Sequence, residues 1–506
     1  MSRAGRDRDD TSLGQVRLNS RAGRIVLVTT VAGASVTLLT GSAVFVALPT
    51  IANDLGASSA QQQWIVNAFL LVVSSLILIG GTLGDHFGRV RMYRIGVTWV
   101  GLVSIALAFA PNIELLIFGR LIEALGAALV IPGGLAILEA TLHPDDRGRG
   151  IGAWAGLVGI AAAIGPLGGG LLLELSWRAV FLLNSPAVII ALIASRGVPE
   201  SSNLAQRSTP IDWLGSLLTI TALGGLSFAL IEGPSSGFVG LPLIAAIASL
   251  LAVIGIIAYE PGHEGAILPV DLFSNRTFTV ANLLTFLLYS AIGLVFFLLP
   301  TQLQVTLGFS PFESSLVFVP LTILMLTFSA KTGDFAQRRG PRMPLIIGSL
   351  VLAVSLLGFS FIGPKASSLI FVLAMASIFG AALAIVVAPV TSTALSSVPA
   401  ERAGAASGFN NAVSRTAQLL AVAAIPPLSG LTGAALTDAG QLNTGFQIAM
   451  WIIAAISVGA AALATTLGSG SHLIRTGPRH HRACPIDGTI PHRPTVEVGA
   501  APDISE

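Results

Sequence analysis

The amino-acid sequence predicts an all-α membrane protein in which two six-helix bundles and two inserted helices supply 14 transmembrane helices. Its 53% hydrophobic and 10% charged residues, with a mean hydropathy of +0.83, exclude a soluble protein, because soluble domains carry about 25% charged residues. Fourteen apolar blocks are long enough to cross a bilayer, which takes roughly 20 helical residues. A charged motif recurs at equivalent places in the two halves, which indicates a repeat.

The predicted spans follow one another along nearly the whole chain. They are residues 25–49, 62–84, 93–110, 113–142, 149–174, 178–196, 213–232, 241–259, 278–300, 312–330, 343–363, 368–392, 404–430 and 446–467. Residues 1–24 are polar and precede a block long enough to span, so we expect no cleavable signal. Residues 468–506 are rich in Gly, Pro, His and Arg without periodicity, so we expect a disordered tail.

The basic residues predict how the chain is oriented in the membrane. If the N-terminus is cytoplasmic, all but four of the 27 basic residues lie on the cytoplasmic side; Arg178 and Lys365 face out, and Arg120 and Arg415 lie within spans. Cytoplasmic loops are enriched in Lys and Arg. The preference for arginine over lysine is typical of a GC-rich bacterial genome. We therefore expect a multi-pass protein of a bacterial inner membrane with both termini in the cytoplasm.

The repeat predicts the domain organisation. Gly84-Asp85 follows the second span and Gly333-Asp334 follows the tenth, each with arginines after it. Two repeated halves around a site at mid-membrane can expose that site to each side in turn. The predicted domains are a cytoplasmic N-terminal segment (1–24), an N-terminal six-helix bundle (25–196), a linker with the inserted helices (197–277), a C-terminal six-helix bundle (278–467) and a cytoplasmic tail (468–506).

The two recurring loops have the chemistry of a latch. Glycines allow close helix approach and a tight turn, while the aspartate can pair with arginines or accept hydrogen bonds from a helix N-terminus. We expect this cluster to hold the cytoplasmic side shut, although an ordinary charged loop is the alternative. The latch residues are Gly81, Asp85, Gly88, Arg89, Arg91, Asp334 and Arg338. From Gly81 to Arg91 the chain resembles the signature loop of the major facilitator superfamily, Gly-x-x-x-Asp-x-x-Gly-Arg-x-Arg, which implies that superfamily's fold.

The fifth span resembles the antiporter signature of that superfamily's drug exporters. It reads Gly165-Pro166-Leu167-Gly168-Gly169-Gly170, with Ala161 where the signature has a glycine. Pro166 removes a helix hydrogen bond, and Gly165 and Gly169 flatten one face, so the helix can kink, pack tightly, and seal or hinge. The resemblance favours export by antiport; close packing with no bearing on direction is the alternative.

The fourth span holds the most costly charges, Arg120 and Glu123. They are spaced i, i+3 and can pair on one face. A charge near the bilayer centre costs at least about 2.5–3.5 kcal/mol, so such residues usually carry function. We predict Glu123 as the proton carrier and Arg120 as its modulator, a permanent structural pair being the alternative. The superfamily's Arg-x-x-Gln-Gly signature matches at Arg120 and departs at Glu123 and Ala124.

The first span departs from the fourteen-helix drug:proton antiporters, which the chain otherwise resembles over nearly all of 25–467. Those antiporters typically show Leu-Asp-x-Thr, with Asn later; here Thr40 stands in place of the acid and Phe45 in place of the amide. Either Glu123 has taken over proton coupling, or coupling differs or is lost. The segments that carry the resemblance elsewhere are Gln63-Trp64-Ile65-Val66-Asn67, Ile211-Asp212-Trp213-Leu214-Gly215 and Ser407-Gly408-Phe409-Asn410-Asn411.

Polar and aromatic residues within the spans are candidates for a substrate cavity. Asn411, Arg415 and Gln418 fall at i, i+4 and i+7 and share one helix face. Amides and hydroxyls inside membrane helices also bond neighbouring helices, which is the alternative for each one. The candidate cavity residues are Thr40, Phe45, Asn67, Asn282, Tyr289, Asn410, Asn411, Arg415 and Gln418.

The sequence lacks the residues that metal-binding, nucleotide-binding and nucleic-acid-binding proteins require. All seven histidines lie in predicted loops or the tail, and the chain has one cysteine, so we expect no metal site and no cofactor. No phosphate-binding Gly-Lys-Ser/Thr loop is present, and a net charge of +2 does not favour nucleic acid. We expect a monomeric transporter, not an enzyme, that exports a small drug-like amphipathic molecule in exchange for protons. A proton-independent uniporter or importer, and a non-transporting membrane sensor, remain the alternatives.

Overall fold

The computed structural model describes residues 15–201, 211–260, 270–364, 368–399 and 402–468. Residues 1–14, most of the predicted cytoplasmic N-terminal segment, lie outside the described residues, as does the predicted tail beyond residue 468. The described residues belong to one compact unit, Met1–Ser471.

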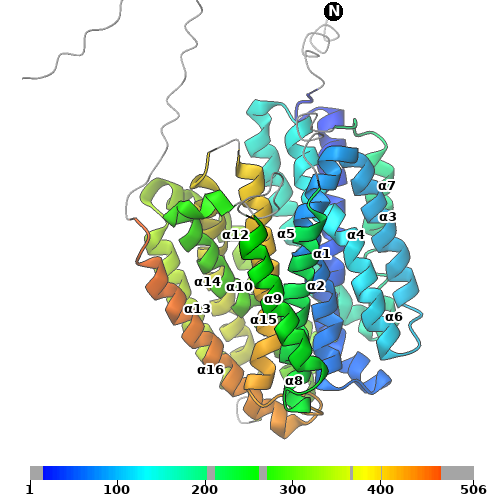
Figure 1. The fold of residues 1–506 in the computed structure, drawn as a ribbon, viewed down its shortest axis with the longest axis vertical. Helices are drawn as coiled ribbons and strands as arrows, with labels where there is room; N and C mark the ends of the chain where they lie inside the picture. Colours follow the sequence, from blue (N-terminus) through cyan, green and yellow to red (C-terminus); the bar gives the residue numbers. More distant parts are fainter. Residues whose placement is uncertain (1–14, 202–210, 261–269, 365–367, 400–401, 469–506) are drawn as a thin grey trace, which may run out of the picture. The chain divides into compact units, whose positions relative to one another are not determined.

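The described chain is helical throughout, as predicted (Figure 1). The first half comprises α1 (Arg21–Leu55), α2 (Ser59–Phe87), α3 (Arg89–Leu107), α4 (Ile113–Thr141), α5 (Pro144–Leu173), α6 (Trp177–Val180) and α7 (Ser185–Ser195). The inserted pair is α8 (Trp213–Ser236) and α9 (Leu241–Tyr259). The second half comprises α10 (Arg276–Thr301), α11 (Pro311–Ser315), α12 (Phe318–Arg339), α13 (Arg342–Phe359), α14 (Leu369–Ser396), α15 (Ala403–Leu428) and α16 (Ala439–Ala464).

Thirteen helical segments of the described chain are long and apolar enough to cross a membrane. Three of them join consecutive elements: α6 with α7, α11 with α12, and α10 with the π-helical turn Gln302–Thr306. The remaining long helix, α15, spans 26 residues and carries several polar side chains. The fold is therefore the predicted one, with 14 long helical segments.

Several helices extend beyond their predicted bounds. Helix α2 continues to Phe87 and α12 to Arg339, so Asp85 and Asp334 lie in helices rather than in loops. Helix α1 begins at Arg21, capped by Ser20, and α16 begins at Ala439, earlier than the predicted residue 446. An apolar run ends at the first charge, whereas a helix satisfies its own backbone hydrogen bonds and continues into the polar region of the membrane.

The end of the bundle at which α1 begins and α2 and α4 end carries most of the basic side chains. They include Arg17, Arg89, Arg94, Arg147, Arg149, Arg338, Arg339 and Arg342. We call this end the basic end.

The inserted helices form a hairpin that packs against both halves. Helix α8 contacts α2 of the first half and α15 of the second half, and α9 packs on α8 (Figure 1). The Trp64 indole Nε1 donates to the Glu232 carboxylate at 3.0 Å, and the Trp64 and Phe228 rings lie 6.1 Å apart. Helix α9 leaves most of its apolar side chains exposed, as suits a surface in contact with lipid.

Glu200, just after α7, caps the N-terminus of α3. Its carboxylate accepts the backbone N–H groups of Val90 and Arg91, both at 2.9 Å. A carboxylate there also interacts favourably with the helix dipole. We expect Glu200→Ala to cost about 1 kcal/mol of stability, measured as a lower midpoint of thermal unfolding in detergent. Glu174→Ala is the matched control, because Glu174 lies at a helix C-terminus and caps no N–H group; an equal loss in both variants would contradict the capping role.

Candidate functional site

A cavity of about 610 Å³ lies between the two halves. Helices α1, α2, α4 and α5 line it from the first half, and α10, α12, α14 and α15 line it from the second. The predicted residues that line it are Phe45, Arg120, Tyr289, Asn411, Arg415 and Gln418. The expected stripe on α15 therefore does face a cavity.

Three aromatic rings line the cavity toward the end opposite the basic end. Phe45 of α1 and Phe296 of α10 lie 5.9 Å apart in an edge-to-face arrangement, and Phe296 lies 4.7 Å from Phe318. Aromatic rings packed in this way bury a large apolar area. Because Phe45 belongs to the first half and the other two to the second, the cluster joins the halves.

The hydrogen bonds between the halves also lie at that opposite end. Among the described residues they are Gln304 Nε2 to the Val46 carbonyl at 2.9 Å, the Ser59 N–H to the Gly433 carbonyl at 2.8 Å, and the Leu436 N–H to Ser59 Oγ at 3.1 Å. The cavity lining extends toward the basic end as far as Gly152 and Ala330. We infer that the cavity is reached from the basic end.

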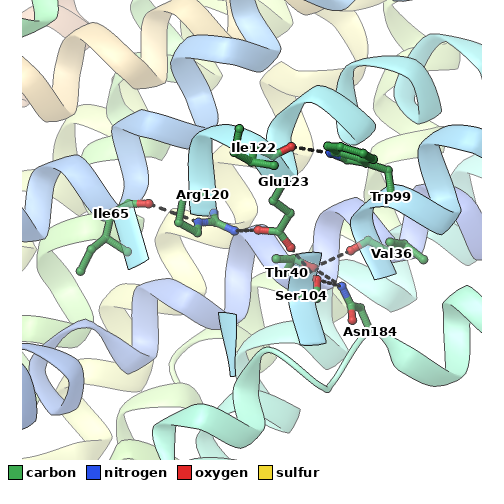
Figure 2. Close-up of polar contacts among 9 residues, drawn as sticks. All are labelled: Val36, Thr40, Ile65, Trp99, Ser104, Arg120, Ile122, Glu123 and Asn184. Carbon is green, nitrogen blue, oxygen red and sulfur yellow. Dashed lines mark hydrogen bonds and ion pairs between the residues drawn. The ribbon is translucent and has the colours of Figure 1, made fainter. Parts of the chain in front are cut away.

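Arg120 and Glu123 form an ion pair inside the first half (Figure 2). Arg120 Nη1 donates to Glu123 Oε2 at 2.5 Å, and the side chains are only 2% and 0% exposed. Arg120 Nε also donates to the Ile65 carbonyl at 3.3 Å, and its guanidinium lies 4.4 Å from the centre of the Phe69 ring. Arg120 lines the cavity and Glu123 does not. A molecule in the cavity therefore meets the guanidinium, with the carboxylate behind it.

A chain of hydrogen bonds connects Glu123 to Thr40, the residue that stands in place of the usual acid (Figure 2). Ser104 Oγ donates to Glu123 Oε1 at 2.6 Å. Asn184 Nδ2 donates to Ser104 Oγ at 2.9 Å and to Thr40 Oγ1 at 2.7 Å. The first helix thus has Thr40 in place of the usual acid, and the carboxyl group of Glu123 lies at the other end of the same hydrogen-bond network. Ser104 and Asn184 are not among the site residues predicted from the sequence. The only sequence feature that could have identified them is their polarity within apolar spans.

Four predicted cavity residues lie outside the lining. Thr40 is part of the network around Glu123. Asn410 Nδ2 donates to Asn282 Oδ1 at 3.1 Å and to Thr285 Oγ1 at 2.9 Å, which joins α10 and α15. Asn67 is fully buried, and neither its Nδ2 nor its Oδ1 has a partner in the described chain. Asn282 and Asn410 thus connect two helices, as amides in membrane interiors often do.

The latch residues form their pairs within each half. Arg89 Nε donates to Asp85 Oδ1 at 2.7 Å, and Arg338 Nε donates to Asp334 Oδ1 at 3.0 Å. Gly88 has a φ of 105°, which suits a glycine turn, and a Cβ on Gly81 would lie 3.7 Å from Pro132 of α4. The backbone N–H of Arg91 binds Glu200. Among the described residues, neither aspartate–arginine pair joins the two halves.

The predicted hinge on α5 packs directly against α1. A Cβ on Gly165 would lie 1.9 Å from Ser42 Oγ, and one on Gly169 would lie 2.9 Å from the Ala43 Cβ. Pro166 lies between them within the helix. Closer to the basic end, Gly152, Gly156 and Gly159 line the cavity instead. One helix thus uses glycines both to approach α1 and to widen the cavity.

Gly165→Val should destabilise the protein by about 1–3 kcal/mol, because the added carbons overlap Ser42 and push α5 from α1. Gly156→Val is the matched control for stability, since no atom lies within 4 Å of a Cβ there. Thermal unfolding of the two purified variants should separate them, with only Gly165→Val lowering the midpoint. Equal midpoints would show that the close approach of α5 to α1 is dispensable for stability.

Comparison with known proteins agrees with this architecture. Residues 30–422 match the family model of the Major Facilitator Superfamily. The tetracenomycin C resistance and export protein of Streptomyces glaucescens is 32% identical over 79% of this chain and 74% of its own length. A multidrug resistance protein of Mycobacterium tuberculosis is 30% identical over 78% of this chain and 73% of its own.

Among solved structures, the D-xylose-proton symporter superposes with a TM-score of 0.61 at 16% identity, covering 88% of this chain and 97% of that one. This likeness concerns the fold alone. The family match covers more than half of the chain, and the relatives are resistance and export proteins. The protein is therefore a small-molecule transporter of the membrane, not an enzyme, and belongs to the major facilitator superfamily, in its fourteen-helix drug:proton antiporter branch.

Proposed function

We propose that the protein exports drug-like amphipathic molecules in exchange for protons, by alternating access of the cavity between its two six-helix halves. The observation that carries the proposal is the buried Arg120–Glu123 pair, whose guanidinium lines the cavity and whose carboxylate lies behind it. The resistance and export relatives support the direction and the class of substrate.

The charge distribution supports the orientation. The basic end faces the cytoplasm, because short cytoplasmic loops carry the excess of Lys and Arg. The cavity reached from that end can then take up a molecule from the cytoplasm. Closure at the basic end and separation of the aromatic cluster at the opposite end would release it outside. The protein acts as a monomer in the bacterial cell membrane with both termini inside.

The Arg120–Glu123 ion pair couples transfer of the proton to transfer of the substrate, and Arg120 is the link between them. A substrate that occupies the cavity holds Arg120 against Glu123, which favours the ionised carboxylate and release of the proton to the cytoplasm. Protonation of Glu123 from outside removes the charge that holds Arg120. The freed guanidinium then extends into the part of the cavity that the apolar body of the substrate occupies, and burial of that body against an unpaired charge is unfavourable. Proton and substrate therefore exclude each other, as antiport requires.

Proteoliposomes test this proposal. With the purified protein in vesicles that are acidic inside, a panel of lipophilic cations, neutral drugs and organic anions should include compounds that accumulate inside. Accumulation should release protons from the lumen and collapse with a protonophore. Movement of substrate down its gradient only, with no proton signal, would establish the proton-independent uniporter that the missing acid at Thr40 favours. No movement of any compound would favour the non-transporting sensor.

A further inference from the structure

Arg415 of α15 is a second cation in the cavity, partly buried, and the described chain provides no acidic partner for it. Its side chain lines the cavity, and its Nε has no hydrogen-bond partner. The salt bridges of the described residues all involve other side chains. Tyr289 of α10 lines the same cavity. A charge within a membrane protein normally pairs with another group, so the natural partner of Arg415 is a molecule in the cavity.

The remaining cavity wall defines the chemistry of that partner. Among the described residues, no Asp or Glu lines the cavity. Glu123 lies behind Arg120. Phe45, Phe69, Phe296 and Phe318 provide aromatic surface, and aliphatic side chains of α12 and α14 continue it. Asn411 and Gln418, next to Arg415 on the same face of α15, supply further hydrogen-bond donors. An organic cation would meet two guanidinium groups and no carboxylate.

We infer that the cavity selects amphipathic organic anions, whose carboxylate, sulfonate or phenolate group binds Arg415 while an aromatic body lies on the phenylalanine surface. This inference rests on the proposed transport through the cavity and names the substrate class. Arg415 is the uncommitted site, since Arg120 is already bound to Glu123 and the Ile65 carbonyl. A guanidinium binds a carboxylate through two parallel N–H donors, which a lysine cannot reproduce.

Three fluorescent probes of matched shape test the inference. At pH 7, dansyl-β-alanine is an anion, its primary amide is neutral, and dansyl-ethylenediamine is a cation. Binding is measured by the fluorescence change on titration of the purified protein in detergent. We expect the anion to bind at least about tenfold more tightly than the amide, and the cation to bind most weakly. No binding of the anion, or equal or tighter binding of the amide or cation, would overturn the inference.

Substitutions then place the anion site. Arg415→Gln should remove the difference between anion and amide while leaving the amide's affinity unchanged, which also shows that the variant is folded. Arg415→Lys should retain part of the preference. Arg339→Gln, on the exposed basic end, is the control and should bind like the wild type. A preference that survives Arg415→Gln would assign the anion to another residue and overturn the inference. Binding in detergent needs no gradient, so it is independent of whether transport is coupled to protons.

Discussion

Glu123→Gln should abolish proton-driven accumulation of substrate, reducing it to the level of vesicles that lack the protein. Glutamine keeps the shape and can still bind Ser104 and Arg120, but it cannot take up or release a proton. Exchange of labelled for unlabelled substrate without a gradient should persist, because that exchange needs the cavity and the movement of the halves and not the proton. Both quantities are measured in the same proteoliposomes.

Glu139→Gln is the matched control, since Glu139 lies on the same helix, outside the network around Glu123 and outside the cavity lining. It should accumulate substrate like the wild type. Substrate-driven proton release that survives in Glu123→Gln would exclude Glu123 as the proton carrier.

A second experiment tests the hydrogen-bond network itself. Thr40→Asp combined with Glu123→Gln places a carboxyl group at the other end of the Asn184–Ser104 chain. Restored coupling in this double variant would show that the network, and not one position, carries the proton.

Arg120→Met should destabilise the folded protein by about 3–5 kcal/mol, because it leaves the fully buried Glu123 carboxylate without its cation. Methionine retains much of the volume beside Phe69, so the loss reports charge rather than packing. We expect a marked fall in the midpoint of thermal unfolding in detergent.

The double variant Arg120→Met/Glu123→Leu should recover most of that stability, because replacing both members of a buried ion pair by apolar residues is often neutral. Proton-driven export should nevertheless be absent in the double variant, because it lacks the Glu123 carboxyl group. A double variant as unstable as Arg120→Met would show that the arginine stabilises the protein through Ile65 or Phe69 instead. The comparison thus separates the structural from the coupling role of the pair.

The membrane spans and the Arg120–Glu123 pair could be predicted because they depend on local sequence. A run of about 20 apolar residues must be helical in a bilayer, where backbone groups find no water. Residues at i, i+3 lie on one helix face whatever the surroundings. For the same reason the spacing of Asn411, Arg415 and Gln418 puts them on one face of α15, and all three line the cavity. Helix ends were less predictable, since a helix continues past the last apolar residue into polar surroundings.

The tertiary structure alone decided which polar residues line the cavity and which connect helices. Thr40, Ser104 and Glu123 come from three helices and Asn184 from the N-cap of α7, and only packing brings these side chains within hydrogen-bond distance. The sequence by itself determined the number of helices, their apolar character and the presence of charges that need partners. The identity of the partners depends on helix rotation and on the close approach that glycines permit, and these contacts between distant segments have no local sequence signal.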